Sequence, residues 1–260
     1  MSASPTQLRV FQLQGNDKMI LKKSLCSVFV GVLLAACGGG GSDGGSTSVN
    51  TAEGYWSGPA SSGYNVSLAV LENGEAWGIY SSGSTIYGAL NGTANGSGTA
   101  FTGSGKDFNF VSGTVSAGSF TGTVAQKSRI AATANTGGTV SLTYQSDYDK
   151  PASLANLAGT YSGSGRTGRY TFSGSIPISS TGSFTAVDGA CTTTGALTPR
   201  SSGKNIFNFT ATFVGTCALA SGTTVSGVAY LDTTATPYRV LALGLNSDKS
   251  DGVVILGTKQ

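Results

Sequence analysis

Carboxylates are the plausible acid–base groups of this 260-residue sequence, because it contains no histidine. That absence excludes a Ser-His-Asp triad, a histidine general base and imidazole metal ligands. Glu72 and Glu75 flank an Asn-Gly pair and could act together as the two carboxylates of a glycosidase. A hairpin tip is convex, however, whereas a catalytic pair needs a cleft. We therefore predict that the protein is not an enzyme.

Two other acidic pairs could supply oxygen ligands to a metal ion. Asp147 and Asp149 are two residues apart, and Asp248 and Asp251 lie in a polar stretch near the C-terminus. Ca²⁺ takes about six to eight oxygen ligands, so neither pair is sufficient alone. Turn chemistry accounts for the Asp and Gly residues of the second stretch. We predict neither a bound metal nor a cofactor.

Four aromatic residues form the best candidate binding patch: Trp56, Trp77, Tyr80 and Tyr87. They lie on neighbouring predicted strands, and an exposed aromatic patch could stack on sugars or dock a protein. Core packing is the alternative, because aromatic residues are common in strands generally. Trp77 and Tyr80 fall on opposite faces of one strand. With Trp77 in the core, we expect Tyr80 outside, beside Tyr87.

The elements that must position these residues are β-strands. Alternation of apolar and polar residues dominates from residue 51 onwards, and it is clearest where Phe207, Phe209 and Phe213 share one strand face. Such alternation predicts antiparallel sheets with one buried and one wet face. Asn73-Gly74 is typical of a two-residue hairpin turn. Helix is expected only as a single turn within residues 153–159, which Ser153 could cap.

A short repeat divides the strands into two modules. Residues 54–58 read Gly-Tyr-Trp-Ser-Gly, and residues 159–163 read Gly-Thr-Tyr-Ser-Gly. We predict an all-β protein with modules at 51–149 and 150–260. Each should be a small antiparallel barrel or compact meander of about eight strands. The inward positions carry many small residues, namely Gly88, Gly174, Ala211, Gly227 and Ala242. We therefore expect packed barrel interiors without a ligand cavity.

The N-terminal segment resembles a bacterial lipoprotein signal. Lys22 and Lys23 precede the apolar residues 24–34, and the sequence Leu-Ala-Ala-Cys then ends at Cys37. The apolar stretch is too short to span a bilayer, which takes about 20 residues. The resemblance implies that the leader 1–36 is removed, that Cys37 is acylated, and that translation starts at Met19. Residues 37–50, rich in Gly and Ser, would be a flexible lipidated tether.

Charge and cysteine content agree with an envelope protein. The formal net charge is +3, but residues 1–36 hold four of the 15 basic and one of the 12 acidic residues, which leaves eleven of each. A chain without net charge gives no reason to expect a nucleic-acid partner. Cys191 and Cys217 remain after processing, and we predict a disulfide between them in an oxidising compartment. Two buried free thiols are the alternative.

The whole mature chain resembles a group of glycine-rich bacterial outer-membrane lipoproteins without established function. Four features carry the resemblance: the motif that ends at Cys37, the Gly-Thr-Tyr-Ser-Gly segment 159–163 that opens the second module, the pair Cys191 and Cys217, and the C-terminal segments 245–247 and 257–259. The Gly-rich stretch 118–124 is also similar to barrel modules of transferrin-binding-protein-B-type surface lipoproteins. Gly38 after the lipidated cysteine implies sorting to the outer membrane, with the protein held by its lipid.

Two functions are open from the sequence. The first is non-enzymatic recognition of a protein, a glycan or an envelope component, or a structural role in the envelope. The alternative is a lipocalin-like carrier of a small apolar ligand, which needs a cavity inside a barrel. A filled barrel axis would exclude the carrier.

Overall fold

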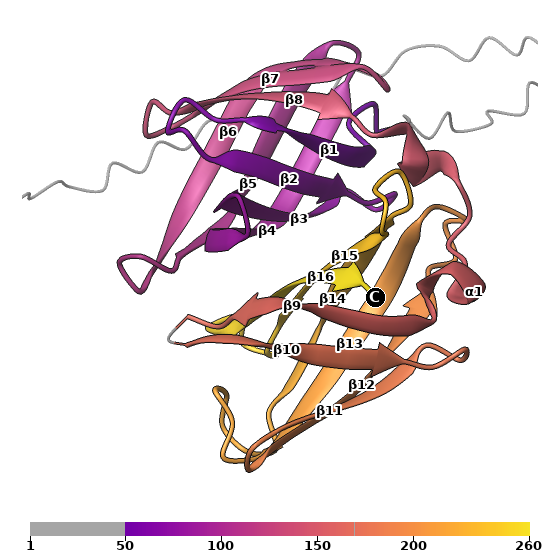
Figure 1. The fold of residues 1–260 in the computed structure, drawn as a ribbon. Coiled ribbons are helices and arrows are strands. Elements are labelled where there is room, and N and C mark those ends of the chain that lie inside the picture. Colours follow the sequence, from indigo (N-terminus) through magenta and orange to yellow (C-terminus); the bar gives the residue numbers. More distant parts are fainter. Residues whose placement is uncertain (1–49, 169) are drawn as a thin grey trace, which may run out of the picture. The chain divides into compact units, whose positions relative to one another are not determined.

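The computed structural model describes residues 50–168 and 170–260, and it consists almost entirely of antiparallel β-strands (Figure 1). The strands form two closed eight-stranded barrels, one after the other along the chain. The all-β prediction with two small barrels is therefore confirmed. The predicted leader, tether and acylated Cys37 lie outside the described residues. No helix in the described part is long and apolar enough to span a bilayer.

The first barrel is an up-and-down meander in which each strand pairs with the next and β8 closes on β1. Residues 71–74 connect β2 and β3, so the hairpin lies where it was predicted, but its connection is longer than the expected two residues. The N–H of Gly74 donates to the oxygen of Leu71 at 2.9 Å, and Gly74 takes a positive φ of 81° that favours glycine. The strands are β1 (Gly54–Pro59), β2 (Asn65–Val70), β3 (Glu75–Ser82), β4 (Thr85–Ser97), β5 (Ala100–Asn109), β6 (Thr114–Ala125), β7 (Arg129–Ala134) and β8 (Thr139–Tyr144).

The second barrel repeats this order and closes by pairing β16 with β9. The clearest alternating segment of the sequence forms β13, whose phenylalanines point into the barrel and are buried. The strands are β9 (Gly159–Arg166), β10 (Thr171–Ile178), β11 (Ser183–Asp188), β12 (Cys191–Pro199), β13 (Ile206–Gly215), β14 (Thr224–Asp232), β15 (Arg239–Leu245) and β16 (Gly252–Lys259).

A short connection joins the barrels through the 3₁₀ turn η1 (Ser146–Asp149) and the single helical turn α1 (Leu154–Leu157). Ser153 caps α1 by accepting a hydrogen bond from the backbone N–H of Asn156, as expected from the sequence. In η1, Asp147 is almost completely buried. Its carboxylate accepts hydrogen bonds from Asn205 Nδ2 at 2.9 Å and from Thr233 Oγ1 at 2.7 Å. These bonds fix the connection to the second barrel.

A disulfide joins Cys191, the first residue of β12, to Cys217 just beyond β13. The sulfur atoms are 2.04 Å apart, so the predicted disulfide is confirmed. It closes a loop with a sequence separation of 26, which the chain-entropy model associates with roughly 3 kcal/mol of stabilisation. Both cysteines pack at one end of the second barrel's core.

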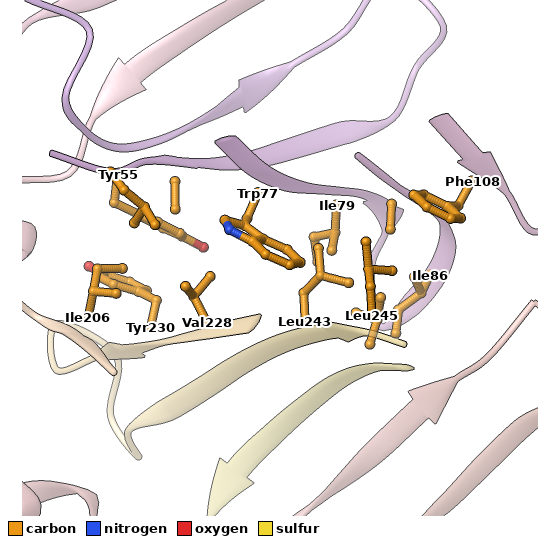
Figure 2. Close-up of a cluster of buried hydrophobic side chains, with 14 of the residues drawn as sticks. Tyr55, Trp77, Ile79, Ile86, Phe108, Ile206, Val228, Tyr230, Leu243 and Leu245 are labelled. Carbon is orange, nitrogen blue, oxygen red and sulfur yellow. The ribbon is translucent and has the colours of Figure 1, made fainter. Parts of the chain in front are cut away.

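Three hydrophobic cores stabilise the described part of the chain. One fills part of each barrel interior, and the third lies between the barrels (Figure 2). In the third core, the rings of Tyr55 and Tyr230 stack with centroids 3.7 Å apart. Trp77 and Ile79 of the first barrel face Val228 and Leu243 of the second. These strands therefore bury their outer faces as well as their inner ones.

The expectation of one wet face is wrong for this part of the molecule. Strand β16 contains the unbroken run Val253 to Leu256, and β15 contains Val240 to Leu243. Continuous apolar runs are typical of strands covered on both faces. Here the cover on the outer face is the other barrel. The polar contacts beside this core include Arg166, whose guanidinium donates to the backbone oxygens of Ile86 and Phe110.

Candidate ligand cavities

The axis of the first barrel is open and encloses a cavity of about 350 Å³. The expectation of packed interiors is therefore wrong. Small residues at inward positions leave space instead of filling it: a Cβ atom added at Gly118 would meet no atom within 4 Å. The inner wall is mostly apolar and is built from Val66, Leu68, Ala94, Phe101, Ile130 and Leu142. The cavity reaches the connections 60–64 and 134–139.

Two tyrosines, Tyr64 and Tyr80, line one side of this cavity, and Tyr87 packs against Tyr64. The rings of Tyr64 and Tyr87 stack with centroids 4.7 Å apart, and the ring of Tyr80 lies 5.7 Å from that of Tyr64. The strand pairing explains the gathering, since Tyr80 pairs with Gly88 and Ser81 with Ile86, which leaves Tyr87 as the extra residue of a bulge. Any Cβ atom on Gly88 would collide with the Tyr80 hydroxyl.

Asp107 brings a carboxylate to the same place. It faces inward on β5, where it pairs with Leu90, and it is half-buried. Tyr80 donates its hydroxyl proton to Asp107 Oδ1 at 2.9 Å. Burial raises the pKa of Asp107, although the hydrogen bond from Tyr80 acts in the opposite direction. Burial and the neighbouring carboxylate both raise the pKa of Tyr80, which keeps the phenol protonated.

The second barrel encloses a smaller cavity of about 190 Å³. Its wall is apolar over most of its extent and includes Phe172, Ile176, Phe184, Phe209, Phe213 and Val240. Asp188 is the one charged residue among the described residues that line it, and it is exposed at the end of β11. The Cys191–Cys217 disulfide also belongs to the lining. This cavity therefore suits an uncharged apolar group.

The four aromatic residues proposed from the sequence separate into different environments. Trp56 is fully buried inside the first barrel, where its indole N–H donates to the oxygen of Ala52 at 2.9 Å. Trp77 lies in the core between the barrels, and Tyr80 and Tyr87 flank Tyr64 at the cavity. Neither tryptophan offers an exposed surface.

The expectation that Tyr80 points outward is wrong. Trp77 and Tyr80 do lie on opposite faces, but Trp77 is on the barrel's outer face, which the second barrel covers. Tyr80 consequently points inward. Sequence reasoning also missed Tyr64 and Asp107. Strand parity could have found them, because Tyr64 alternates with Val66 and Leu68, and Asp107 alternates with Phe101.

The remaining acidic candidates are engaged in structural contacts. Glu72 forms an ion pair with Arg200 at 2.8 Å instead of facing a partner carboxylate in a cleft. Asp149 receives ion pairs from Lys127 and Lys204. Asp248 accepts hydrogen bonds from Ser250 within its own turn. In residues 50–168 and 170–260, no three His, Cys, Asp or Glu side chains gather as a metal site would require.

The fold and cavities define a class of two-barrel β-proteins with ligand-sized interiors. The sequence matches no protein-family model and no curated protein. Among solved structures, it is similar to a candidate outer membrane protein from Bacteroides fragilis, with 14% identity over 80% of this chain and 96% of the other, and a TM-score of 0.23. It is also similar to a protein of unknown function of the DUF3598 family from Nostoc punctiforme, with 9% identity, coverage of 81% and 97%, and a TM-score of 0.28. Likenesses of this size carry no argument about function.

Proposed function

We propose that the protein is a lipid-anchored binding protein of the outer membrane that takes a small, largely apolar molecule into a barrel cavity. The observation that supports this most directly is the open axis of the first barrel, with a cavity of about 350 Å³. Eight strands are enough for a barrel to hold one small ligand when its inward side chains are small. The cavity volume is at the lower end of the range of about 300–1,000 Å³ for small-molecule sites.

Recognition of a small molecule has better support than docking of a protein or glycan on an exposed aromatic patch. Trp56 and Trp77 are buried, Tyr80 lines the cavity with Tyr64, and Tyr87 stacks on Tyr64. A binding role without catalysis fits the acidic side chains, because Glu72 and Asp149 are held in ion pairs and do not face a shared cleft.

Membrane attachment rests on the lipoprotein-like motif that ends at Cys37. The 13 residues from 38 to 50 would span roughly 20 Å as a flexible Gly-rich chain. The barrels would then remain close to the bilayer from which a small apolar molecule could be collected. Labelled palmitate should be incorporated by the native chain and not by Cys37→Ala. Labelling of both chains, or of neither, would refute the anchor.

The ligand-binding part is tested by filling each cavity separately. Gly118 lines the first cavity and Gly174 the second, and a Cβ atom at either position meets no atom within 4 Å. Gly118→Leu and Gly174→Leu are therefore matched variants. Small molecules that copurify with the chain should be identified by mass spectrometry. We expect Gly118→Leu to lose the bound molecule and Gly174→Leu to retain it. The absence of any bound or bindable small apolar molecule would refute the proposal.

A further inference from the structure

Asp107, Tyr64 and Tyr80 meet on the wall of the first cavity, whose remaining polar lining residues are neutral apart from Lys106. Of the described residues that line the cavity, Asp107 is the one carboxylate. Lys106 is the other charged lining residue, but its ammonium group donates to the backbone oxygen of Lys249 at 2.8 Å. Arg166, which also influences Tyr80, uses its guanidinium on two backbone oxygens. The side chain of Asp107 is thus the negative group that a ligand meets.

Aromatic faces beside a carboxylate are a combination that attracts cations. A cation within about 6 Å of an aromatic ring centre is attracted to the face of the ring, more strongly as the site is desolvated. Tyr64 and Tyr80 present two such rings at the cavity, and Asp107 adds the opposite charge. Tyr80 has already donated its proton to one carboxylate oxygen, Oδ1. Asp107 Oδ2 remains as a further acceptor for an N–H group.

We propose that the ligand of the first barrel is a small amphiphilic amine, whose ammonium group binds Asp107 beside Tyr64 and Tyr80 and whose apolar body enters the cavity. This inference rests on the proposed ligand-binding function and specifies its substrate class. The apolar part would contact Val66, Phe101 and the other inner residues of the wall. The second barrel has no equivalent arrangement, since its lining carboxylate, Asp188, is exposed and stands at the rim.

The test compares three ligands of equal length: pentylammonium, pentanol and pentanoate. Their binding to the full chain is measured by isothermal titration calorimetry, with Cys37→Ser so that no acyl chain competes. We expect pentylammonium to bind at least tenfold more tightly than pentanol, and pentanoate to bind most weakly. Asp107→Asn should lower the affinity for pentylammonium at least tenfold and change that for pentanol less than twofold. Asp188→Asn is the matched control and should change neither affinity.

The outcomes separate the inference from the function on which it rests. Equal binding of pentanol and pentylammonium, or an unchanged preference in Asp107→Asn, overturns the amine and leaves a cavity that binds apolar molecules. Binding of none of the three ligands overturns both. Should Asp107→Asn fail to fold, the native chain provides a second measurement. Its affinity for pentylammonium should fall as Asp107 is protonated at acidic pH, while its affinity for pentanol stays constant; parallel curves would overturn the inference.

Discussion

Replacing Trp77 with alanine should weaken the core that joins the two barrels. The side chain is 6% exposed and lies among residues of both barrels (Figure 2). A buried aromatic side chain removes about 150–250 Å² from water, and burial at about 25 cal/mol per Å² corresponds to about 4–6 kcal/mol. The indole N–H of Trp77 has no hydrogen-bond partner among the residues that the structure describes, and such a group costs about 1–3 kcal/mol. The net loss should be about 3 kcal/mol.

The matched variant Trp77→Phe separates these two contributions. It keeps most of the buried area and removes the unpaired N–H, so we expect a loss below about 1 kcal/mol. Val187→Ala is the surface control, because Val187 is 69% exposed. Equilibrium urea unfolding, followed by far-UV circular dichroism and by tryptophan fluorescence, gives the free energy of unfolding of each variant relative to the native chain.

Cooperativity is the sharper measurement in this experiment. In the two Trp77 variants the remaining Trp56 reports on the first barrel alone, whereas circular dichroism reports on both barrels. In Trp77→Phe the two signals should change together, because the shared core still couples the barrels. In Trp77→Ala the transitions should separate. A loss for Trp77→Ala no greater than that for Val187→Ala, with coincident transitions, would refute the argument that the core between the barrels stabilises both.

Three further predictions concern the second barrel and the connection. The double variant Cys191→Ser/Cys217→Ser should lose roughly 3 kcal/mol of unfolding free energy, and a reductant should lower the urea midpoint of the native chain but not of the variant. Asp147→Ala should lose about 3 kcal/mol of unfolding free energy in the same assay, because buried hydrogen-bond donors lose a charged acceptor. Asp248→Ala, in an exposed turn, should change the unfolding free energy little. Burial opposes ionisation of Asp149, but hydrogen bonds from its lysine partners lower its pKa to about 2. The stability that Asp149 contributes should therefore be retained above about pH 4 and be lost as the pH falls towards 2. In an acid titration, Asp149→Asn should lack this loss of stability.

The strands and their grouping into two barrels could be predicted from the sequence. Alternation in residues 206–213 reports inward and outward positions directly, and this segment forms β13 with its phenylalanines inside. The repeated Gly-x-aromatic-Ser-Gly segments fall on β1 and β9, the first strand of each barrel. Local patterns suffice for most of the pairing, because each strand pairs with its neighbour in the chain. The two closing pairs, β1 with β8 and β9 with β16, join strands that are distant in the sequence.

The core between the barrels could not be predicted from alternation alone. An alternating pattern separates the two faces of a strand but does not show which face points to the barrel axis. The sequence therefore predicts Trp77 in the core and Tyr80 outside, whereas Tyr80 points to the axis and Trp77 lies on the outer face. The unbroken apolar runs in β15 and β16 carried the missing information, since strands with two apolar faces must be covered twice. Which surface provides the cover depends on packing between modules. That packing involves pairs such as Tyr55 and Tyr230, which are far apart in the sequence.

The neighbours of each glycine explain why the cavities could not be predicted from the sequence. An inward glycine creates space only when no side chain from a neighbouring strand lies over it. In the second barrel the rings of Phe172 and Phe184 cover Gly165 and Gly195, so that a Cβ atom at either glycine would collide with a ring. In the first barrel the Tyr80 hydroxyl covers Gly88 in the same way. Nothing covers Gly118 of the first barrel or Gly174 of the second. The composition of inward positions therefore does not determine whether a barrel is filled; the cross-strand neighbours of each glycine do.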